Sequence, residues 1–264
     1  MKKTDDLKAT TYAERLRNAS ISKSTISPLR EEIGVDNIDF AYEIQYVNTE
    51  FRLSQGHRIV GKKIGLTSKA VQKQLGVDQP DFGILFNDME VLNGQSISVK
   101  ELMQPKVEAE IAFILAEDLD VENLTIVDLI DCIDYALPAI EIVGSRIENW
   151  NIKITDTIAD NASASHYVVG HTPKTLDEFD VVNCHMHMRV RGESVSRGKG
   201  SACLGSPLNA TLWLANKMIK MRQPLQAGEL VLSGALGPMA NIKAGDNVLA
   251  EIQGLGAVSV NFTE

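Results

Sequence analysis

The sequence has little of what marks secreted, disulfide-linked or membrane proteins. Its 264 residues include only three cysteines (Cys132, Cys184 and Cys203), with no C-x-x-C spacing. This odd, scattered set predicts free thiols in a reducing compartment and argues against a disulfide framework. No apolar run approaches the roughly 20 residues of a membrane-spanning helix. The N-terminal residues lack the apolar segment of a signal peptide, so we expect a cytoplasmic protein with no membrane partner.

An excess of positive charge is also missing. Lys and Arg total 26 against 35 Asp and Glu, giving a formal net charge of −9 at pH 7. An acidic surface repels phosphate backbones, so nucleic acid is not an expected partner. Hydrophobic residues make up 44% of the chain, enough to bury a sizeable core. The length permits one large domain, or one domain with a smaller lobe.

The first third of the chain is predicted to be mainly helical. Apolar side chains recur at helical spacing over residues 38–51, just after a capping pair at 36–37. Residues 57–67 then have the character of a strand. A short helix is expected over 69–75, with Ser68 as its N-cap.

From about residue 80 the pattern changes to short strands and turns. Apolar or alternating segments predict strands near 107–115, 137–144, 184–192, 228–234, 247–253 and 257–263. Helices are expected after Thr125 and after the Ser206-Pro207 cap. Because few strands alternate with helices, a doubly wound parallel sheet is not expected. We predict an α+β fold, a mixed and mainly antiparallel β-roll (81–264) with a small helical N-terminal lobe (1–80).

Two of the predicted strands carry carboxylates within apolar runs. Glu108 and Glu110 point to the same face of their strand, and Glu141 lies inside the run Ala139–Val143. Burying such charges unpaired costs several kcal/mol. A hard divalent cation, Mg2+ or Mn2+, shared by the three would offset that cost. The alternative is a solvent-facing side of the sheet, with each glutamate paired to a lysine or arginine.

The segment Gly61–Ser68 places lysines between glycines ahead of a helix N-terminus. Backbone N–H groups there can hold a carboxylate, and a lysine beside a cation would have a lowered pKa suited to proton transfer. The order of residues does not match a phosphate-binding loop. The alternative is an ordinary strand-to-helix turn with solvated lysines. The small polar residues of 155–163 are typical of a substrate-lining loop and equally of a capped turn.

Five segments, taken together and in order, resemble the hydratase/decarboxylase branch of the fumarylacetoacetate hydrolase superfamily. They begin GKKIGLTSK, QPKVEAEI, PAIEIVGSR, LGSPLNATL and AGDNVLAEI, and occupy residues 61–85, 104–115, 138–163, 204–216 and 244–262. They span nearly the whole chain, and their co-occurrence is far more specific than any one motif. The resemblance implies a β-roll like the family's C-terminal domain, usually in symmetric oligomers.

The resemblance also implies a role for individual residues. The family's metal ligands fall on Glu108, Glu110 and Glu141, which implies a Mg2+ or Mn2+ cofactor. Its catalytic lysine falls on Lys63. Asp156 or Asp160 is expected to orient water or substrate. The family's substrate-lining positions fall on Leu66, Thr67, Ser68 and Ser163.

The implied reaction is the addition of water to a 2-hydroxydienoic acid, 2-hydroxypenta-2,4-dienoate, through a metal-stabilised dienolate. The segment 138–163 lacks an insertion that hydratases of longer dioic acids usually carry, which favours a short monoacid. The alternative is decarboxylation of 4-oxalocrotonate, a dioic acid, by a sister enzyme. A third reading is a non-catalytic partner in a hydratase–decarboxylase complex. A homo-oligomer, alone or complexed with a sister decarboxylase or hydratase, is the expected assembly.

Overall fold

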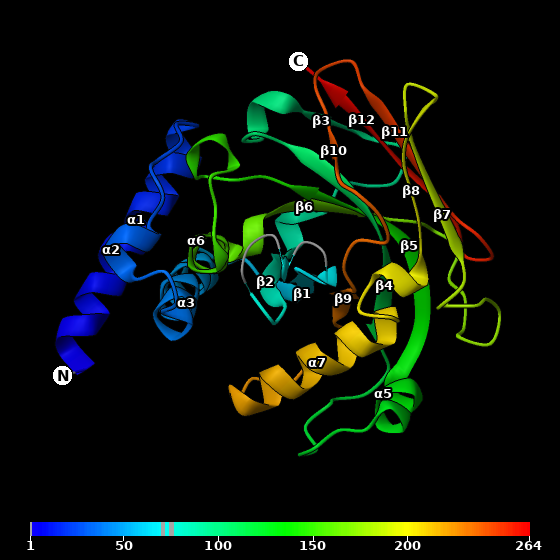
Figure 1. Cartoon of the computed structure of the whole chain (residues 1–264), viewed down its shortest axis with the longest axis horizontal. Coiled ribbons are helices and arrows are strands. Elements are labelled where there is room, and N and C mark those ends of the chain that lie inside the picture. Colours follow the sequence, from blue (N-terminus) through cyan, green and yellow to red (C-terminus); the bar gives the residue numbers. More distant parts are fainter. Residues whose placement is uncertain (1, 70–71, 74–76) are drawn as a thin grey trace.

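The N-terminal end of the chain is helical. In the computed structural model, which describes residues 2–69, 72–73 and 77–264, three helices precede the first strand: α1 (Lys2–Ser22), α2 (Arg30–Ile33) and α3 (Ile38–Ser54). They lie together at one end of the molecule (Figure 1). α3 buries Ala41 and Ile44, so the helix predicted over 38–51 is confirmed. The helix expected over 69–75 lies largely outside the described residues.

The larger of two sheets has seven strands within the described part of the chain. In order they are β2 (Asp81–Phe86), β1 (Ile59–Gly65), β9 (Leu230–Leu232), β4 (Lys106–Leu115), β5 (Ile133–Val143) and β6 (Ala164–Val169), with β10 (Ala240–Asn241) also on β4. Among the described strands of this sheet, only β1 and β9 pair in parallel. The long strands β4 and β5 carry the sheet through the middle of the molecule (Figure 1).

The second sheet has five strands among the described residues. They run in the order β3 (Ser96–Ser98), β12 (Gly256–Thr263), β11 (Asn247–Ile252), β7 (His185–Val190) and β8 (Glu193–Lys199). β11 and β12 contact β5, so the two sheets enclose a shared core. A predicted α+β fold with a mainly antiparallel, curled sheet is therefore confirmed.

Short helices cover the larger sheet. α5 (Ile126–Cys132) begins at Thr125, whose side chain accepts a hydrogen bond from the Asp128 N–H, and α7 (Pro207–Lys220) begins at Ser206 with proline in its first turn. Both predicted helix starts are confirmed, and the two helices pack together. α6 (Ile154–Ala159) packs on α3 and β2. Single 3-10 turns are η1 (Asn87–Met89), η2 (Val99–Glu101), η3 (Glu148–Trp150), η4 (Asn161–Ser163) and η5 (Gly200–Ala202).

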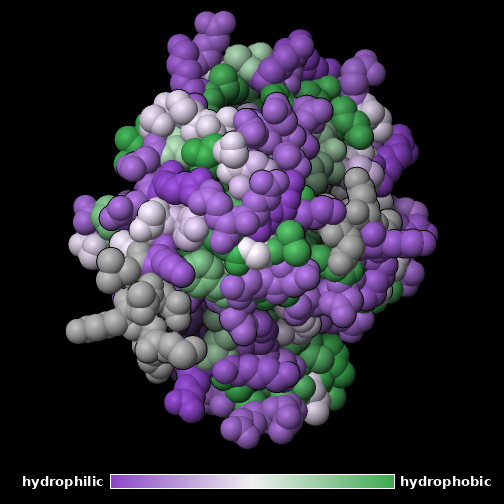
Figure 2. Space-filling view, turned by 60° about the vertical axis from the view of Figure 1, so that its left-hand side comes forward, coloured by the Kyte–Doolittle hydropathy of each residue, from purple (hydrophilic) through white to green (hydrophobic). Residues whose placement is uncertain are grey.

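The surface shows mixed character. In the view of Figure 2, hydrophilic side chains cover most of the face and hydrophobic ones are scattered between them. Among the described residues, no helix is both long enough and apolar enough to cross a bilayer.

β1 is an inner strand of the larger sheet, although it lies within the first 80 residues. The division into a lobe of 1–80 and a domain of 81–264 stays a prediction.

Candidate active site

Strand register brings three glutamates together. β4 and β5 pair antiparallel with Glu108 directly opposite Glu141, and Glu110 lies two residues further along on the same face. One carboxylate oxygen from each residue lies within 4.8 Å of the other two. Glu110 and Glu141 are buried, and Glu108 is partly exposed. Like charges facing each other on a sheet are destabilising, so this arrangement requires a compensating positive charge.

The glutamate oxygens are incompletely satisfied. Glu110 Oε2 accepts a hydrogen bond of 2.8 Å from the Gly234 N–H, where φ is +108° and a side chain would collide with Thr67. Among the described residues, Glu110 Oε1 and Glu141 Oε1 have no hydrogen-bond partner. Burial raises the pKa of Glu110 well above its ordinary value, and raises that of Glu141 to about 7. Buried, orphaned, oxygen-only donors fit a hard divalent cation.

Lys63 supplies the nearest positive charge. It lies on β1 with its side chain almost fully buried, and its Nζ is 3.2 Å from Glu141 Oε2. The same ammonium donates a hydrogen bond of 3.0 Å to the Ala162 carbonyl. Burial alone would lower the pKa of Lys63, but the carboxylates led by Glu141 raise it above its ordinary value. Four carboxylates surround the lysine, and the lowered pKa expected for a lysine beside a bound cation stays a prediction.

A fourth carboxylate of the site, Asp81, is buried and was not predicted from the sequence. Asp81 begins β2 opposite Gly65 of β1, and neither of its carboxylate oxygens has a hydrogen-bond partner among the described residues. A side chain at Gly65 would place Cβ 2.1 Å from Asp81 Oδ1, so glycine is what admits the aspartate. Burial raises the pKa of Asp81 although Lys63 opposes this shift. The sequence signal for it is an Asp at the head of the apolar strand DFGILF.

These groups open onto one cavity of about 460 Å³. Lys63, Asp81 and Glu108 line it, so three of the five ionisable groups described above face the same space. The predicted substrate-lining residues also line it: Leu66, Thr67, Ser68 and Ser163. The remaining wall is largely apolar and includes Val143, Trp150, Ile152, Leu236, Pro238 and Met239. Convergent charges beside an apolar wall suit a small organic acid.

Asp156 and Asp160 do not line this cavity. Asp156 accepts hydrogen bonds from the Arg30 guanidinium at 2.7 Å and from the Lys153 N–H at 2.9 Å at the start of α6. Asp160 accepts from the Arg146 N–H at 2.9 Å and also binds the guanidinium of that residue. Both aspartates therefore hold the segment that carries Ser163, and their carboxylates are occupied by arginines.

The sequence matches a known protein family over most of its length. The fumarylacetoacetate (FAA) hydrolase C-terminal family matches residues 58–263. This match covers most of the chain, and the chain belongs to that family. The resemblance inferred from the five sequence segments is confirmed.

Individual relatives show which members of the family this chain is most similar to among those compared. The chain is 54% identical to 2-keto-4-pentenoate hydratase 1 of Dechloromonas aromatica (strain RCB), over 95% of each chain. It is also 54% identical to the TodF product hydratase of Pseudomonas putida, over 96% of this chain and 94% of that one. Among solved structures, 4-oxalocrotonate decarboxylase from Pseudomonas putida G7, complexed with magnesium and adipate, superposes with a TM-score of 0.93 at 32% identity, over 97% of each chain.

Proposed function

We propose that this chain is a 2-keto-4-pentenoate hydratase, which converts 2-hydroxypenta-2,4-dienoate and water into 4-hydroxy-2-oxopentanoate. The observation that carries the proposal is the convergence of Glu108, Glu110 and Glu141 beside Lys63 at the edge of a mainly apolar cavity. Relatives named as this hydratase, with identities of 50–54% over nearly the full chain, support it.

The three glutamates hold a divalent cation in this proposal, Mg2+ or Mn2+. Oxygen-only donors favour these ions over zinc. The solved decarboxylase was complexed with magnesium in one structure and with calcium in another. When bound, the ion supplies a Lewis acid for the oxygens at the carboxylate end of a 2-keto acid.

The reaction removes two protons, from the 2-hydroxyl and from water, and adds two, at C5 and C3, and two side chains are placed to carry them. The proton of the 2-hydroxyl leaves and C5 gains one, which gives the α,β-unsaturated keto acid. Water then adds its oxygen at C4, and a proton goes to C3. Lys63 and Asp81 both line the cavity, and in this proposal Lys63 donates a proton and the Asp81 carboxylate accepts one. Ser163 lines the cavity, with its Oγ 3.3 Å from Thr157 Oγ1, and it orients the reacting water in this proposal.

Asp156 and Asp160 act as positioning residues in this proposal. Each fixes one end of the helix-and-turn segment that presents Ser163 and the Ala162 carbonyl to the cavity. Ala162 in turn holds the ammonium of Lys63. Their loss would therefore weaken catalysis through Lys63 rather than through direct contact with substrate. We further propose a cytoplasmic homo-oligomer, alone or complexed with a sister decarboxylase.

A direct assay tests the proposal. Purified chain with Mg2+ is expected to remove the ultraviolet absorbance of 2-hydroxypenta-2,4-dienoate and to yield 4-hydroxy-2-oxopentanoate without releasing CO2. Lys63→Met is expected to slow this reaction by at least about 100-fold, the usual contribution of a general acid or base. Loss of CO2 from 4-oxalocrotonate without hydration of the monoacid would overturn the proposal. Inactivity on both acids, with stimulation of a sister enzyme, would instead indicate a non-catalytic partner.

Decarboxylation of 4-oxalocrotonate is the second candidate. The TM-score of 0.93 to the solved decarboxylase favours it. Arg197 also lines the cavity and offers a cation for a second carboxylate. The hydratase is preferred because the relatives that match with 50–54% identity carry that name, whereas the decarboxylase is 32% identical.

A further inference from the structure

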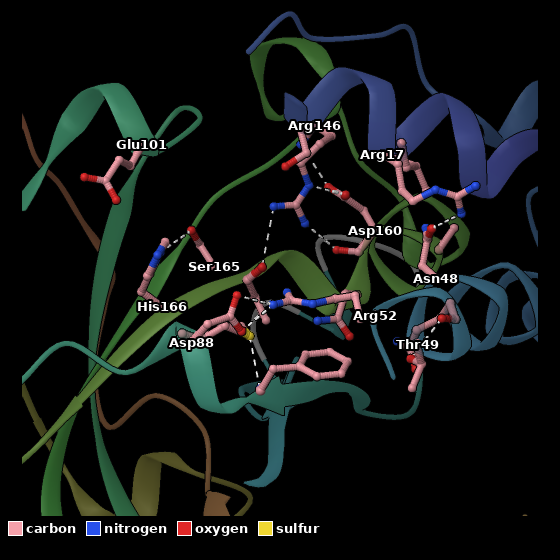
Figure 3. A pocket seen from close by; sticks show the side chains of 18 of the residues that line it. Arg17, Asn48, Thr49, Arg52, Asp88, Glu101, Arg146, Asp160, Ser165 and His166 are labelled. Atoms are coloured by element: carbon pink, nitrogen blue, oxygen red, sulfur yellow. Dashed lines mark hydrogen bonds and ion pairs between the residues drawn. The ribbon is translucent and has the colours of Figure 1, made fainter. Parts of the chain in front are cut away.

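A second cavity of about 470 Å³ lies beside the N-terminal helices. Its walls come from α1, α3, the η2 turn and the start of β6, and Figure 3 shows Arg52 and Arg146 extending toward its middle. It is separate from the catalytic cavity, because the turn η4 (Asn161–Ser163) stands between them. Asn161 lines the second cavity, and Ala162 and Ser163 line the catalytic one. Nothing in the proposed hydration uses this second space.

The cavity is cationic in an acidic protein. Five basic side chains line it against three acidic ones, Asp88, Glu101 and Asp160, while the whole chain carries a net charge of −9. The basic residues come from separate parts of the chain, and are Arg17, Lys23, Arg52, Lys100 and Arg146. A local concentration of positive charge in a concave site attracts and holds anions.

Two of these cations are hydrogen-bonded to neutral partners. Arg17 Nη1 donates to the side-chain oxygen of Asn48 at 2.7 Å, and its contact with Glu14 is longer, at 3.7 Å. Lys23 Nζ donates to the backbone carbonyl of Glu101 at 2.5 Å. Neutral partners leave most of the positive charge of a side chain uncompensated, so both groups retain attraction for an anion.

The two other arginines are held in place by carboxylates. Arg52 pairs with Asp88, and Arg146 pairs with Asp160, so neither guanidinium is free to swing away. Arg146 Nη1 makes only a long contact of 3.5 Å, with the Ala164 carbonyl. Fixed guanidinium groups recognise carboxylate or phosphate oxygens with little loss of side-chain freedom.

We propose that this cavity is a second binding site for a small dianion, either a dicarboxylate or a phosphate monoester. Its volume is within the range of small-molecule sites, and the Asn48 amide and the Ser165 hydroxyl supply additional polar groups. The bound anion contacts Arg17 and Lys23. It also contacts Arg52 and Arg146, beside the carboxylates that already pair with them. It binds without a metal ion, in contrast to a substrate of the catalytic cavity.

Calorimetric titration of the metal-free full-length protein tests this site. The probes are inorganic phosphate and succinate, with neutral succinamide as the comparison, at low ionic strength because salt screens such contacts. One equivalent of at least one dianion is expected to bind, and succinamide is not. Whether phosphate or succinate binds more tightly identifies the ligand class. Because the assay contains neither metal nor substrate, its failure is distinguishable from failure of the hydratase proposal.

Substitutions locate the binding. Arg17→Gln is expected to weaken the dianion about tenfold or more, since a hydrogen bond to a charged group contributes about 1.5–3 kcal/mol. The matched control is Arg15→Gln on the same helix, because Arg15 is paired with Glu32 and does not line the cavity. Lys23→Gln provides an independent second test. Lys63→Met, in the catalytic cavity, is expected to change affinity less than about twofold.

Three results would overturn the proposal. The first is no binding of either dianion by folded wild-type protein. The second is equal binding of succinamide, which would remove the role of charge. The third is a loss of affinity in Lys63→Met with none in Arg17→Gln or Lys23→Gln, which would move the anion to the catalytic cavity.

Discussion

Replacing Glu110 with glutamine tests two properties of the glutamate cluster separately: its effect on stability without metal, and its contribution to stabilisation by metal. Burial raises the pKa of Glu110 well above the ordinary value of 4.5 for a glutamate. At pH 7 the unfolded chain is ionised at this position, so the raised pKa makes Glu110 a net cost to stability when no cation offsets it. Because the folded pKa is raised, that cost grows as pH rises above 4.5 toward the folded pKa. Glu110→Gln removes this titration and keeps an oxygen to accept from the Gly234 N–H.

Two opposite effects are therefore expected. In EDTA at pH 7, Glu110→Gln should be more stable than wild type, and its stability should fall less between pH 5 and pH 7. With Mg2+ or Mn2+ at about 100 times its dissociation constant, wild type should gain about 2.7 kcal/mol. That gain corresponds to about 5–10 °C in Tm. Glu110→Gln should lose most of it.

Thermal unfolding by circular dichroism, with and without metal, measures both effects. Glu251→Gln is the matched control, because Glu251 lies on β11 in an exposed ion pair with Arg189 and has the same charge change. It should keep the full metal-dependent gain. Equal metal stabilisation of wild type and Glu110→Gln would refute the reasoning, as would a Glu110→Gln protein less stable than wild type in EDTA.

Three further changes test other parts of the site. Gly65→Ala should leave the protein folded but lower the kcat of hydration by at least about tenfold, because the new Cβ would lie 2.1 Å from Asp81 Oδ1 and displace that carboxylate. An unchanged kcat would exclude Asp81 from the reaction. Burial raises the pKa of Cys203 to about 12, so wild type should lose about 1.4 kcal/mol per pH unit above pH 9 in urea unfolding, and Cys203→Ala should show a shallower slope. Glu229→Ala should cost about 3 kcal/mol in the same assay, because it leaves the buried ammonium of Lys62 unpaired, and a Lys62→Met/Glu229→Leu double variant should recover most of it.

The parts of the fold that follow from local chemistry were predictable. The cap at Thr125, the Ser206-Pro207 start of α7 and the apolar runs of β4 and β5 each determine an element from adjacent residues. The glutamates could also be placed on strand faces, because side chains alternate along a strand. The convergence of the three glutamates depends on the pairing of β4 with β5. The resemblance to a family implied that these residues converge, whereas their spacing in the sequence alone did not.

The rest of the site depends on contacts between distant segments. Asp81 is a site residue only because β2 pairs with β1 and Gly65 leaves room for its carboxylate. Asp160 instead turns away to bind Arg146, a partner 14 residues earlier in the chain. A run of small polar residues does not indicate which of its members faces a cavity and which anchors the backbone. Sequence patterns therefore identified the segment more accurately than the roles within it.

The pairing of Glu108 with Glu141 has a consequence for how the chain tolerates change. A slip of one residue between β4 and β5 would turn one set of carboxylates to the other side of the sheet and separate the triad. Single-residue insertions between Lys106 and Val143 should therefore be accepted only in the connecting loop. If the proposed cation site is correct, misaligned strands could not assemble it, and metal uptake during refolding would report that the correct alignment had been reached.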